Sequence, residues 1–390
     1  MNWRNIGKNI RTAGHQFLDR LSDNGILPDF DNTPTPLSKA TDRFENASSP
    51  DAKLQALQSM DATTRGQVLK KLDAVERDQL LGGTAFDASV HHTGPAYKYD
   101  WDNFSPQDTG YNPANAHAMA IASKRVYESP EAIKKDYEAQ GFEVKTFDRD
   151  GTQAFLAVKD DVAILSFRGT EPDKIQDLAT DAQICQVEGP GGKVHEGFNK
   201  GLDAVWGDIT REMEAQGVGK DKPLYITGHS LGAALGTLAA ARLDEQGMTP
   251  NGLYTFGSPR VGNEEFADNF NNSELGKRTW RFRNNNDGVA VIPPHGRLMG
   301  YSHVGTELYF DNNGSLHNNP DEKTVCRDRN GAFFSPTQKY FLKKHARMKN
   351  NDNNPAEHLE SMWDHGMTGY VKHIFVNQDF QTSAGTDFKR

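Results

Sequence analysis

The chain has 390 residues, with 44 Lys and Arg against 53 Asp and Glu, so its formal net charge is −9 at pH 7. An acidic chain is a poor partner for the phosphate backbone of nucleic acid, and the composition therefore predicts no nucleic-acid binding. No apolar run approaches the roughly 18 residues that a membrane-spanning helix needs, so we expect no transmembrane segment.

The first residues lack the apolar stretch of about 7–15 residues that is typical of a secretory signal. We therefore expect a cytoplasmic location by default, with export by a route that needs no signal peptide as the alternative. Two cysteines, Cys185 and Cys326, are too few for a disulfide framework or a zinc cluster. The sequence leaves open whether they pair.

Residues 1–95 read as a helical N-terminal region whose role the sequence does not show. A first helix is expected because apolar residues recur at spacings of three and four: Trp3, Ile6, Ile10, Ala13 and Phe17. Its polar positions are mostly basic, so it is suited to an anionic membrane surface, to the main domain or to a partner protein. Two further helices are expected over Asp51–Met60 and Asp61–Leu81.

Residues 96–112 read as a linker, because Gly, Pro, Asp and Asn dominate and no periodicity holds. From 113 to 377 helical and strand patterns alternate, and residues 378–390 form a C-terminal tail. Expected helices are Ala114–Tyr127, Phe198–Gln216, Leu231–Gln246 and Gly366–Phe375. Expected strands are Ala154–Val158 and Val162–Phe167, paired as a hairpin, then Leu224–Thr227, Gly252–Phe256, Thr279–Arg283 and Glu307–Phe310. This alternation predicts an α/β fold with a mostly parallel sheet covered on both faces.

The most informative motif is Gly228-His-Ser230-Leu-Gly232, a G-x-S-x-G pattern. An apolar strand precedes it and a helix rich in small residues follows it. This strand–turn–helix context is typical of a nucleophile elbow, in which a serine stands on a sharp turn with its Oγ exposed. Ser230 is therefore the candidate nucleophile.

Several separated motifs make residues 113–377 resemble the class 3 lipases, a family of α/β-hydrolases known from fungal triacylglycerol lipases, with bacterial relatives. In chain order they are Ser166–Glu171, Val194–Phe198, Gly228–Gly232, Thr255–Asn263, Asn286-Asp287 with Pro293-Pro294, Ser302–Tyr309 and Asp364-His365. The resemblance implies an α/β-hydrolase fold and a Ser-Asp-His triad. It does not extend to the N-terminal 95 residues.

A serine nucleophile needs a general base that is held by a carboxylate. Asp287 follows a predicted strand after the nucleophile, and the resemblance makes it the triad acid. Asp311, which also ends a strand, is the alternative. The resemblance makes His365 the base, and His303 is its rival.

Acyl transfer also needs hydrogen-bond donors aimed at the developing oxyanion. One donor should be the backbone N–H of Leu231, the residue after the nucleophile. The resemblance implies that Thr170 supplies the other. It also places the lid at Glu171–Asp181, which is unusually acidic and polar here.

The sequence thus predicts a serine carboxylester hydrolase, a lipase that cleaves acylglycerol-type esters through an acyl-enzyme. Its substrate would be a lipid ester, met at a membrane or droplet surface. The alternatives are a phospholipase A1 acting on membrane phospholipids, as an exported effector, and a catalytically silent lipid-binding protein. The mechanism requires no metal or other cofactor.

Overall fold

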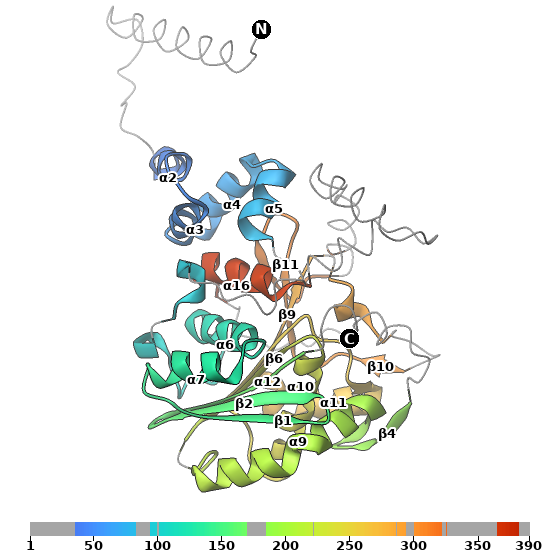
Figure 1. Ribbon diagram of the computed structural model, residues 1–390. Helices are drawn as coiled ribbons and strands as arrows, with labels where there is room; N and C mark the ends of the chain where they lie inside the picture. The colour runs from blue at the N-terminus through green and yellow to red at the C-terminus, as the bar shows by residue number, and fades with distance from the viewer. Residues whose placement is uncertain are drawn as a thin grey trace, which may run out of the picture. The chain divides into compact units, whose positions relative to one another are not determined.

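The computed structural model describes residues 36–82, 94–99, 101–169, 185–220, 222–285, 287–293, 300–321, 325 and 365–381 (Figure 1). The chain divides into two compact units, residues 1–46 and residues 47–390. Of the first unit, the structure describes helix α2 (Pro36–Glu45) and the residue after it. The expected helix around Trp3–Phe17 lies outside the described residues.

The second unit is built on an eight-stranded sheet with the strand order β1-β2-β3-β6-β7-β9-β11-β12. The five inner strands from β3 to β11 run parallel, whereas β1, β2 and β12 pair antiparallel at the edges. The bounds are β1 Glu143–Arg149, β2 Thr152–Lys159, β3 Val162–Phe167, β6 Leu224–His229, β7 Gly252–Phe256, β9 Thr279–Asn284, β11 Thr306–Phe310 and β12 Leu316–Asn318. The prediction of a mostly parallel sheet in an α/β-hydrolase fold is confirmed.

Helices cover both faces of this sheet, and β6 shows how the sequence directs them. Leu224 and Ile226 belong to a core cluster with Leu235 of α10 (Leu231–Glu245). Tyr225 and Thr227, which alternate with them, face the other way. The Thr227 hydroxyl lies 2.7 Å from that of Ser123 in α6 (Pro113–Arg125). Because successive strand residues point to opposite faces, α10 and α6 pack on opposite sides.

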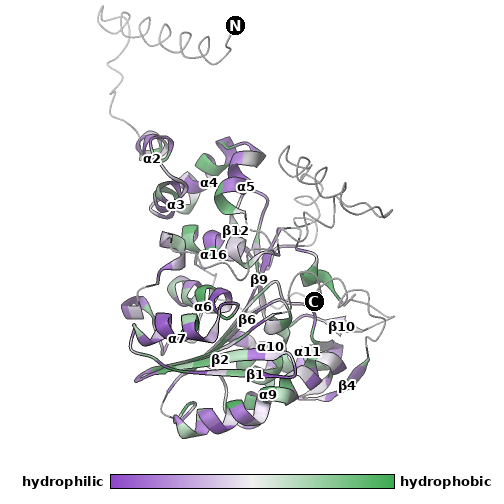
Figure 2. Ribbon diagram, in the orientation of Figure 1, coloured by the Kyte–Doolittle hydropathy of each residue, from purple (hydrophilic) through white to green (hydrophobic). Residues whose placement is uncertain are grey.

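The remaining elements complete the two helical layers and a small second sheet. Helix α9 (Glu196–Ala215) buries Phe198, Leu202, Val205, Ile209 and Met213, the spacing of one helix face. Figure 2 shows hydrophilic and hydrophobic residues alternating around this helix. The others are α7 Pro130–Glu138, α11 Glu264–Asn272, α12 Glu274–Lys277, η4 Val289–Val291 and α16 Met367–Val376, with β4 Gln186–Gly189, β5 Gly192–His195, β8 Gly262–Asn263 and β10 Tyr301–Ser302. Among the described residues, no helix is long and apolar enough to cross a membrane.

Three N-terminal helices belong to the second unit: α3 (Pro50–Gln58), α4 (Ala62–Lys71) and α5 (Ala74–Leu81). The prediction of one helix over Asp61–Leu81 is wrong, because the chain breaks at Leu72, which has extended backbone. Asp73 and Glu76 then form a reciprocal capping box, each carboxylate accepting the backbone N–H of the other. Such a box starts a new helix.

The segment for which the sequence predicts a linker contains two short 3-10 turns, η2 (Pro95–Tyr97) and η3 (Trp101–Asn103). Tyr97 and Phe104 are buried. The hydroxyl of Tyr225 in β6 donates to the carbonyl of Asp108 at 2.6 Å. Phe104 and Asp108 therefore pack against the sheet, whereas η2 packs against α3 and α16. The division of the chain at 95 and 112 stays a prediction.

Candidate active site

Ser230 stands at the turn between β6 and α10. Its backbone has φ 58° and ψ −129°, a conformation that costs a residue with a side chain about 1–3 kcal/mol. The surroundings hold the turn, since the Ser230 N–H donates to the carbonyl of Phe256 in β7 at 3.0 Å. The structure thus contains the elbow that the G-x-S-x-G pattern predicts.

The two glycines of the motif allow strand and helix to approach this closely. A Cβ on Gly228 would lie 2.3 Å from the carbonyl oxygen of Gly232. A Cβ on Gly232 would lie 2.2 Å from the carbonyl oxygen of Phe167 in β3. Both distances are below any real contact, so the elbow requires glycine at each position.

Asp287 and His365 meet beside the elbow. Both carboxylate oxygens of Asp287 lie 2.9 Å from Nδ1 of His365. A carboxylate only accepts, so Nδ1 carries the proton and Nε2 is left as a proton acceptor. In the part of the chain that the structure describes, neither His365 Nε2 nor Ser230 Oγ has a hydrogen-bond partner. The three residues are each 1% exposed.

Asp287 is held in its ionised form by its neighbours. Burial by itself would raise the pKa of the carboxyl group, but the charge of His365 and the hydrogen bonds from His365 and Tyr370 lower the pKa below its ordinary value. The Tyr370 hydroxyl donates at 2.6 Å and the Val289 N–H at 2.9 Å. A buried, ionised carboxylate can orient a histidine and stabilise its protonated form.

His229, next to the nucleophile, holds the backbone of His365. Its Nε2 lies 2.6 Å from the His365 carbonyl oxygen, and its Nδ1 lies 2.9 Å from the Tyr127 hydroxyl. Since a carbonyl only accepts, Nε2 donates and Nδ1 accepts from Tyr127. Burial, with the neighbouring His365, lowers the pKa of His229 to about 3. This ring therefore stays neutral at ordinary pH and serves as a fixed link.

The backbone N–H of Leu231 is the first of α10, where no carbonyl of the helix reaches it. It is therefore available to a developing oxyanion. Thr170 and the expected lid at Glu171–Asp181 lie outside the described residues. Arg168, two positions earlier, donates to the Gln153 amide oxygen at 2.6 Å, and its guanidinium lies 5.5 Å from the centre of the Tyr127 ring.

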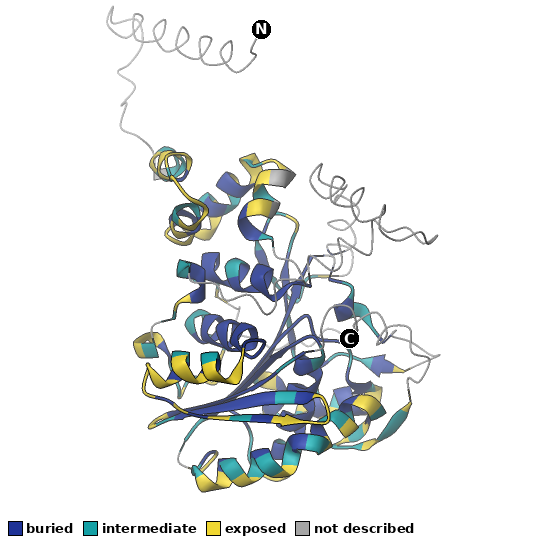
Figure 3. Cartoon of the chain, viewed as in Figure 1, coloured by how far each residue is buried: buried dark blue, intermediate teal, exposed yellow. Residues whose placement is uncertain are grey.

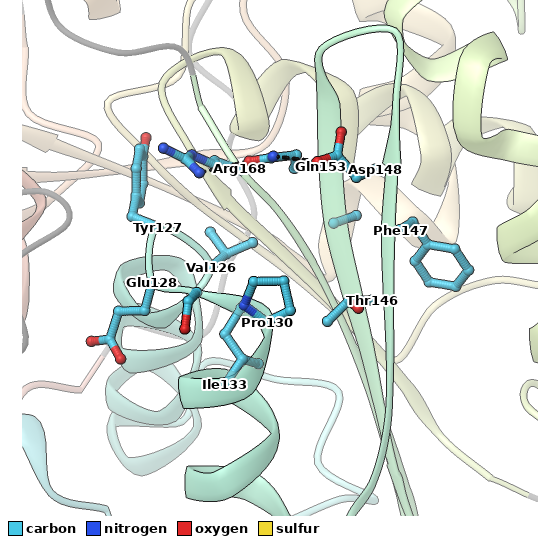
Figure 4. A pocket seen from close by; sticks show the side chains of 12 residues that line it. Val126, Tyr127, Glu128, Pro130, Ile133, Thr146, Phe147, Asp148, Gln153 and Arg168 are labelled. Atoms are coloured by element: carbon cyan, nitrogen blue, oxygen red, sulfur yellow. Dashed lines mark hydrogen bonds between the residues drawn. The ribbon is translucent and has the colours of Figure 1, made fainter.

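A pocket of about 220 Å³ lies beside Arg168, just after the end of β3 (Figure 4). Arg168 and Tyr127 point toward one another at one end, and the apolar side chains of Val126, Pro130 and Ile133 line the other. The pocket and the elbow are neighbours, because a Cβ on Gly169 would touch both the Tyr127 hydroxyl and Cβ of Ser230.

The two alternative residues lie in other surroundings. Asp311 accepts the backbone N–H groups of Asn313 and Ser315, and its other oxygen lies 3.0 Å from His317 Nε2. His303 Nε2 lies 2.7 Å from the carbonyl oxygen of Ala290. The structure brings Asp287 to His365 and neither alternative to the elbow.

Tyr370 and the polar role of His229 were not expected from the sequence. Tyr370 is five positions after His365, on a helix that is otherwise largely apolar. A tyrosine hydroxyl on the buried face of such a helix needs a hydrogen-bond partner, and that is a signal that could have identified it. His229 lies inside the G-x-S-x-G motif, and the pattern around it contains no sign of its two hydrogen bonds.

Comparison with known proteins gives relatives that match part of the chain. The secreted mono- and diacylglycerol lipase 1 of Fusarium solani is 38% identical over 31% of this chain and 35% of its own length. The secreted mono- and diacylglycerol lipase A of Penicillium cyclopium is 32% identical over 45% of this chain and 58% of its own length. The chain thus spans between a third and three fifths of these relatives.

A solved structure, the mono- and diacylglycerol lipase from Aspergillus oryzae, is 26% identical with a TM-score of 0.44. The match covers 53% of this chain and 86% of that one. Both relatives above are named as secreted proteins, which contradicts the expectation of a cytoplasmic location. That expectation was wrong because it rested on the composition of the first residues alone.

The family comparison matches the core of the site. Residues 164–296 fit the family model described as lipase (class 3). The matched segment runs from β3 through the elbow at Ser230 to the loop that carries Asp287. This segment, folded as a mostly parallel sheet around the elbow, is similar to the class 3 lipases.

Proposed function

We propose that the protein is a serine carboxylester hydrolase that cleaves acylglycerol-type lipid esters, and that it acts outside the cell. One observation carries the proposal: Ser230 stands on a strained elbow, with its Oγ unpartnered among the described residues, beside the joined pair Asp287 and His365. The substrate class is supported by the names of the relatives, which are mono- and diacylglycerol lipases.

In the proposed reaction Ser230 Oγ attacks the ester carbonyl carbon while His365 Nε2 takes its proton. The Leu231 N–H stabilises the oxyanion, and Thr170 is proposed as the second donor by family resemblance. The ester C–O bond then breaks and the alcohol leaves with the proton from His365. Water repeats the sequence on the acyl-enzyme and releases the fatty acid. Asp287 keeps the histidine oriented throughout.

The test compares wild type with Ser230→Ala on p-nitrophenyl esters of graded chain length, diacylglycerol emulsions and phospholipid vesicles. We expect kcat to fall by a factor of about 10⁴ or more in the variant, the usual loss for a triad nucleophile. Ser123→Ala is the control. It removes another buried serine hydroxyl, and we expect its kcat to equal that of wild type.

The outcomes separate the alternatives. Preference for diacylglycerol supports the acylglycerol lipase, whereas preference for vesicles would favour the phospholipase A1. Equal activity of wild type and Ser230→Ala would rule out the proposed nucleophile. Absence of hydrolysis in wild type, together with lipid binding, would favour the catalytically silent protein.

A further inference from the structure

Helix α16, which begins two residues after His365, is buried on all its sides. Nine of its ten residues are buried, and most are apolar. A helix that is hydrophobic around its whole circumference needs cover on every face. Figure 1 shows α16 between α6 on one side and α3–α5 on the other, and Figure 3 shows its buried surface. The N-terminal helices α3 and α5 therefore cover part of its surface.

A buried arginine ties the far end of α16 to these helices. Arg65 in α4 is 3% exposed. Its guanidinium donates to Asp379 Oδ1 at 2.5 Å, to Asn377 Oδ1 at 3.3 Å and to the carbonyl of Met60 at 3.0 Å. The planar guanidinium thus joins the α3–α4 turn to the residues that end α16.

Two further contacts support the same attachment. Lys372 Nζ, on α16, donates to the carbonyl of Gly82 at 2.9 Å, just after α5. Arg77 of α5 donates to the carbonyl of Asn312 at 2.7 Å, in the turn between β11 and β12. The helices α3–α5 are fastened to both the last described helix and the edge of the sheet.

The active site depends on where α16 lies. His365 precedes its first turn, and Tyr370 in that turn donates to Asp287. A helix moves as a rigid rod, so a shift at its far end displaces both groups. Catalysis is sensitive to misplacements of about 1 Å.

The geometry points to residues 47–82 as a positioning element of the active site, with Arg65 as its main anchor. This inference rests on the proposed function, and it concerns a segment outside the family match at 164–296. In this inference residues 47–82 act as a strut that holds α16, and through α16 both His365 and Tyr370.

The test compares Arg65→Met with Arg65→Lys. We expect Arg65→Met to lower kcat about tenfold at a temperature where the variant is fully folded, with KM changed less than twofold. Arg65→Lys keeps the charge and should recover part of the loss. Asp379→Asn, at a half-buried carboxylate, gives a milder version of the same change if Arg65→Met does not fold.

Arg211→Met is the matched control. Arg211 pairs with Asp208 at 2.9 Å, but its side chain is 75% exposed on α9. We expect the kcat of Arg211→Met, and the rates of amide hydrogen exchange in its residues 365–381, to equal those of wild type. A fall in unfolding temperature with unchanged kcat in both Arg65→Met and Asp379→Asn would overturn the proposal.

Amide hydrogen exchange of residues 365–381 tests this inference independently of the proposed function, because it does not depend on ester hydrolysis. We expect these amides to exchange faster in Arg65→Met than in wild type or Arg211→Met. If wild type hydrolyses no ester, the proposed function fails while faster exchange still shows that residues 47–82 hold α16. Unchanged exchange would overturn the strut whether or not the protein is active.

Discussion

Asp287 is buried, yet three donors among the described residues reach its carboxylate: His365, Tyr370 and the Val289 N–H. These groups replace the water that burial removes. Tyr370 has a second task, because its hydroxyl also accepts the backbone N–H of Asn284 at 2.9 Å. A single phenol therefore fixes both the proposed triad acid and the loop that carries it.

Tyr370→Phe should weaken both stability and catalysis. The variant removes the acceptor of the Asn284 N–H and a donor that lowers the pKa of Asp287. A hydrogen bond to a charged group contributes about 1.5–3 kcal/mol, so we expect the free energy of unfolding to fall by about 2 kcal/mol. We expect kcat to fall roughly tenfold. Urea denaturation and ester hydrolysis measure the two effects.

The sign of the pH effect follows from the lowered pKa. Asp287 contributes stability above its unfolded pKa near 3.8 and loses it as the pH falls through the lower folded value. In Tyr370→Phe the folded pKa rises, so acid unfolding should begin at higher pH. Tyr137→Phe, at another buried tyrosine, is the control. Equal losses of kcat in both variants would contradict the role of Tyr370.

At the residue scale the sequence singled out Ser230, Asp287 and His365, because each stands in a motif that resembles the class 3 lipases. The structure places the three close together, and their catalytic roles stay predictions. The sequence did not predict Tyr370 or the link through His229. Those roles depend on partners far away in the chain, such as Tyr127 for His229, and no local pattern records such distances. The role of Thr170 stays a prediction.

The elbow is the element on which the site depends most. Here β6 turns into α10 with no room for a side chain at either glycine. The parallel neighbours β3 and β7 hold the turn from both sides. The strain at Ser230 is therefore maintained by the sheet and not by the turn itself.

Gly232→Ala and Gly207→Ala test this packing as a pair. The added methyl at Gly232 would collide with the Phe167 carbonyl, so we expect a loss of about 3 kcal/mol or more in unfolding free energy, with loss of activity. Gly207 lies in α9 with nothing within 4 Å, and alanine there should stabilise the protein by about 0.5–1 kcal/mol. Urea denaturation measures both. Equal changes in unfolding free energy in the two variants would show that the close approach of Gly232 to the Phe167 carbonyl does not constrain the elbow.

The sequence predicted best the helices and strands whose apolar residues recur with a clear period. The hairpin of β2 and β3 pairs Lys159 with Val162 around the expected turn, and α6, α9 and α10 begin within two residues of expectation. The break between α4 and α5 was missed because the apolar spacing continues across it. The packing of Tyr97 and Phe104 was missed because irregular segments carry no periodicity.

At the scale of the whole molecule, residues from the two ends of the second unit meet. Arg65 and Asp379 are 314 positions apart, yet they form an ion pair. Such a contact has no trace in composition or spacing, which is why the sequence left the N-terminal region without a role. The charge balance was informative only about the classes of partner that it excludes.

The described core also contains buried histidines that stay neutral. Burial lowers the pKa of His117 to about 4, of His229 to about 3 and of His373 to about 4. Each is less than 10% exposed. In the unfolded chain their pKa is near 6.5. Between these values the unfolded chain binds protons that the folded protein does not, so acid favours unfolding.

Stability should therefore rise with pH between about 4 and 6.5. Each histidine contributes up to about 1.4 kcal/mol per pH unit, so the three together give about 4 kcal/mol per unit. The carboxylates with lowered pKa, Asp287, Glu307 and Asp311, act below this window, because their contribution is lost only as the pH falls below about 4. Urea denaturation at pH 4.5, 5.5, 6.5 and 7.5 and fixed ionic strength measures the slope. Burial also lowers the pKa of His303 and of His195, so both add to the slope. His117→Gln should reduce the slope by up to about 1.4 kcal/mol per pH unit, and an unchanged slope in that variant would mean that His117 is not excluded from protonation in the folded protein.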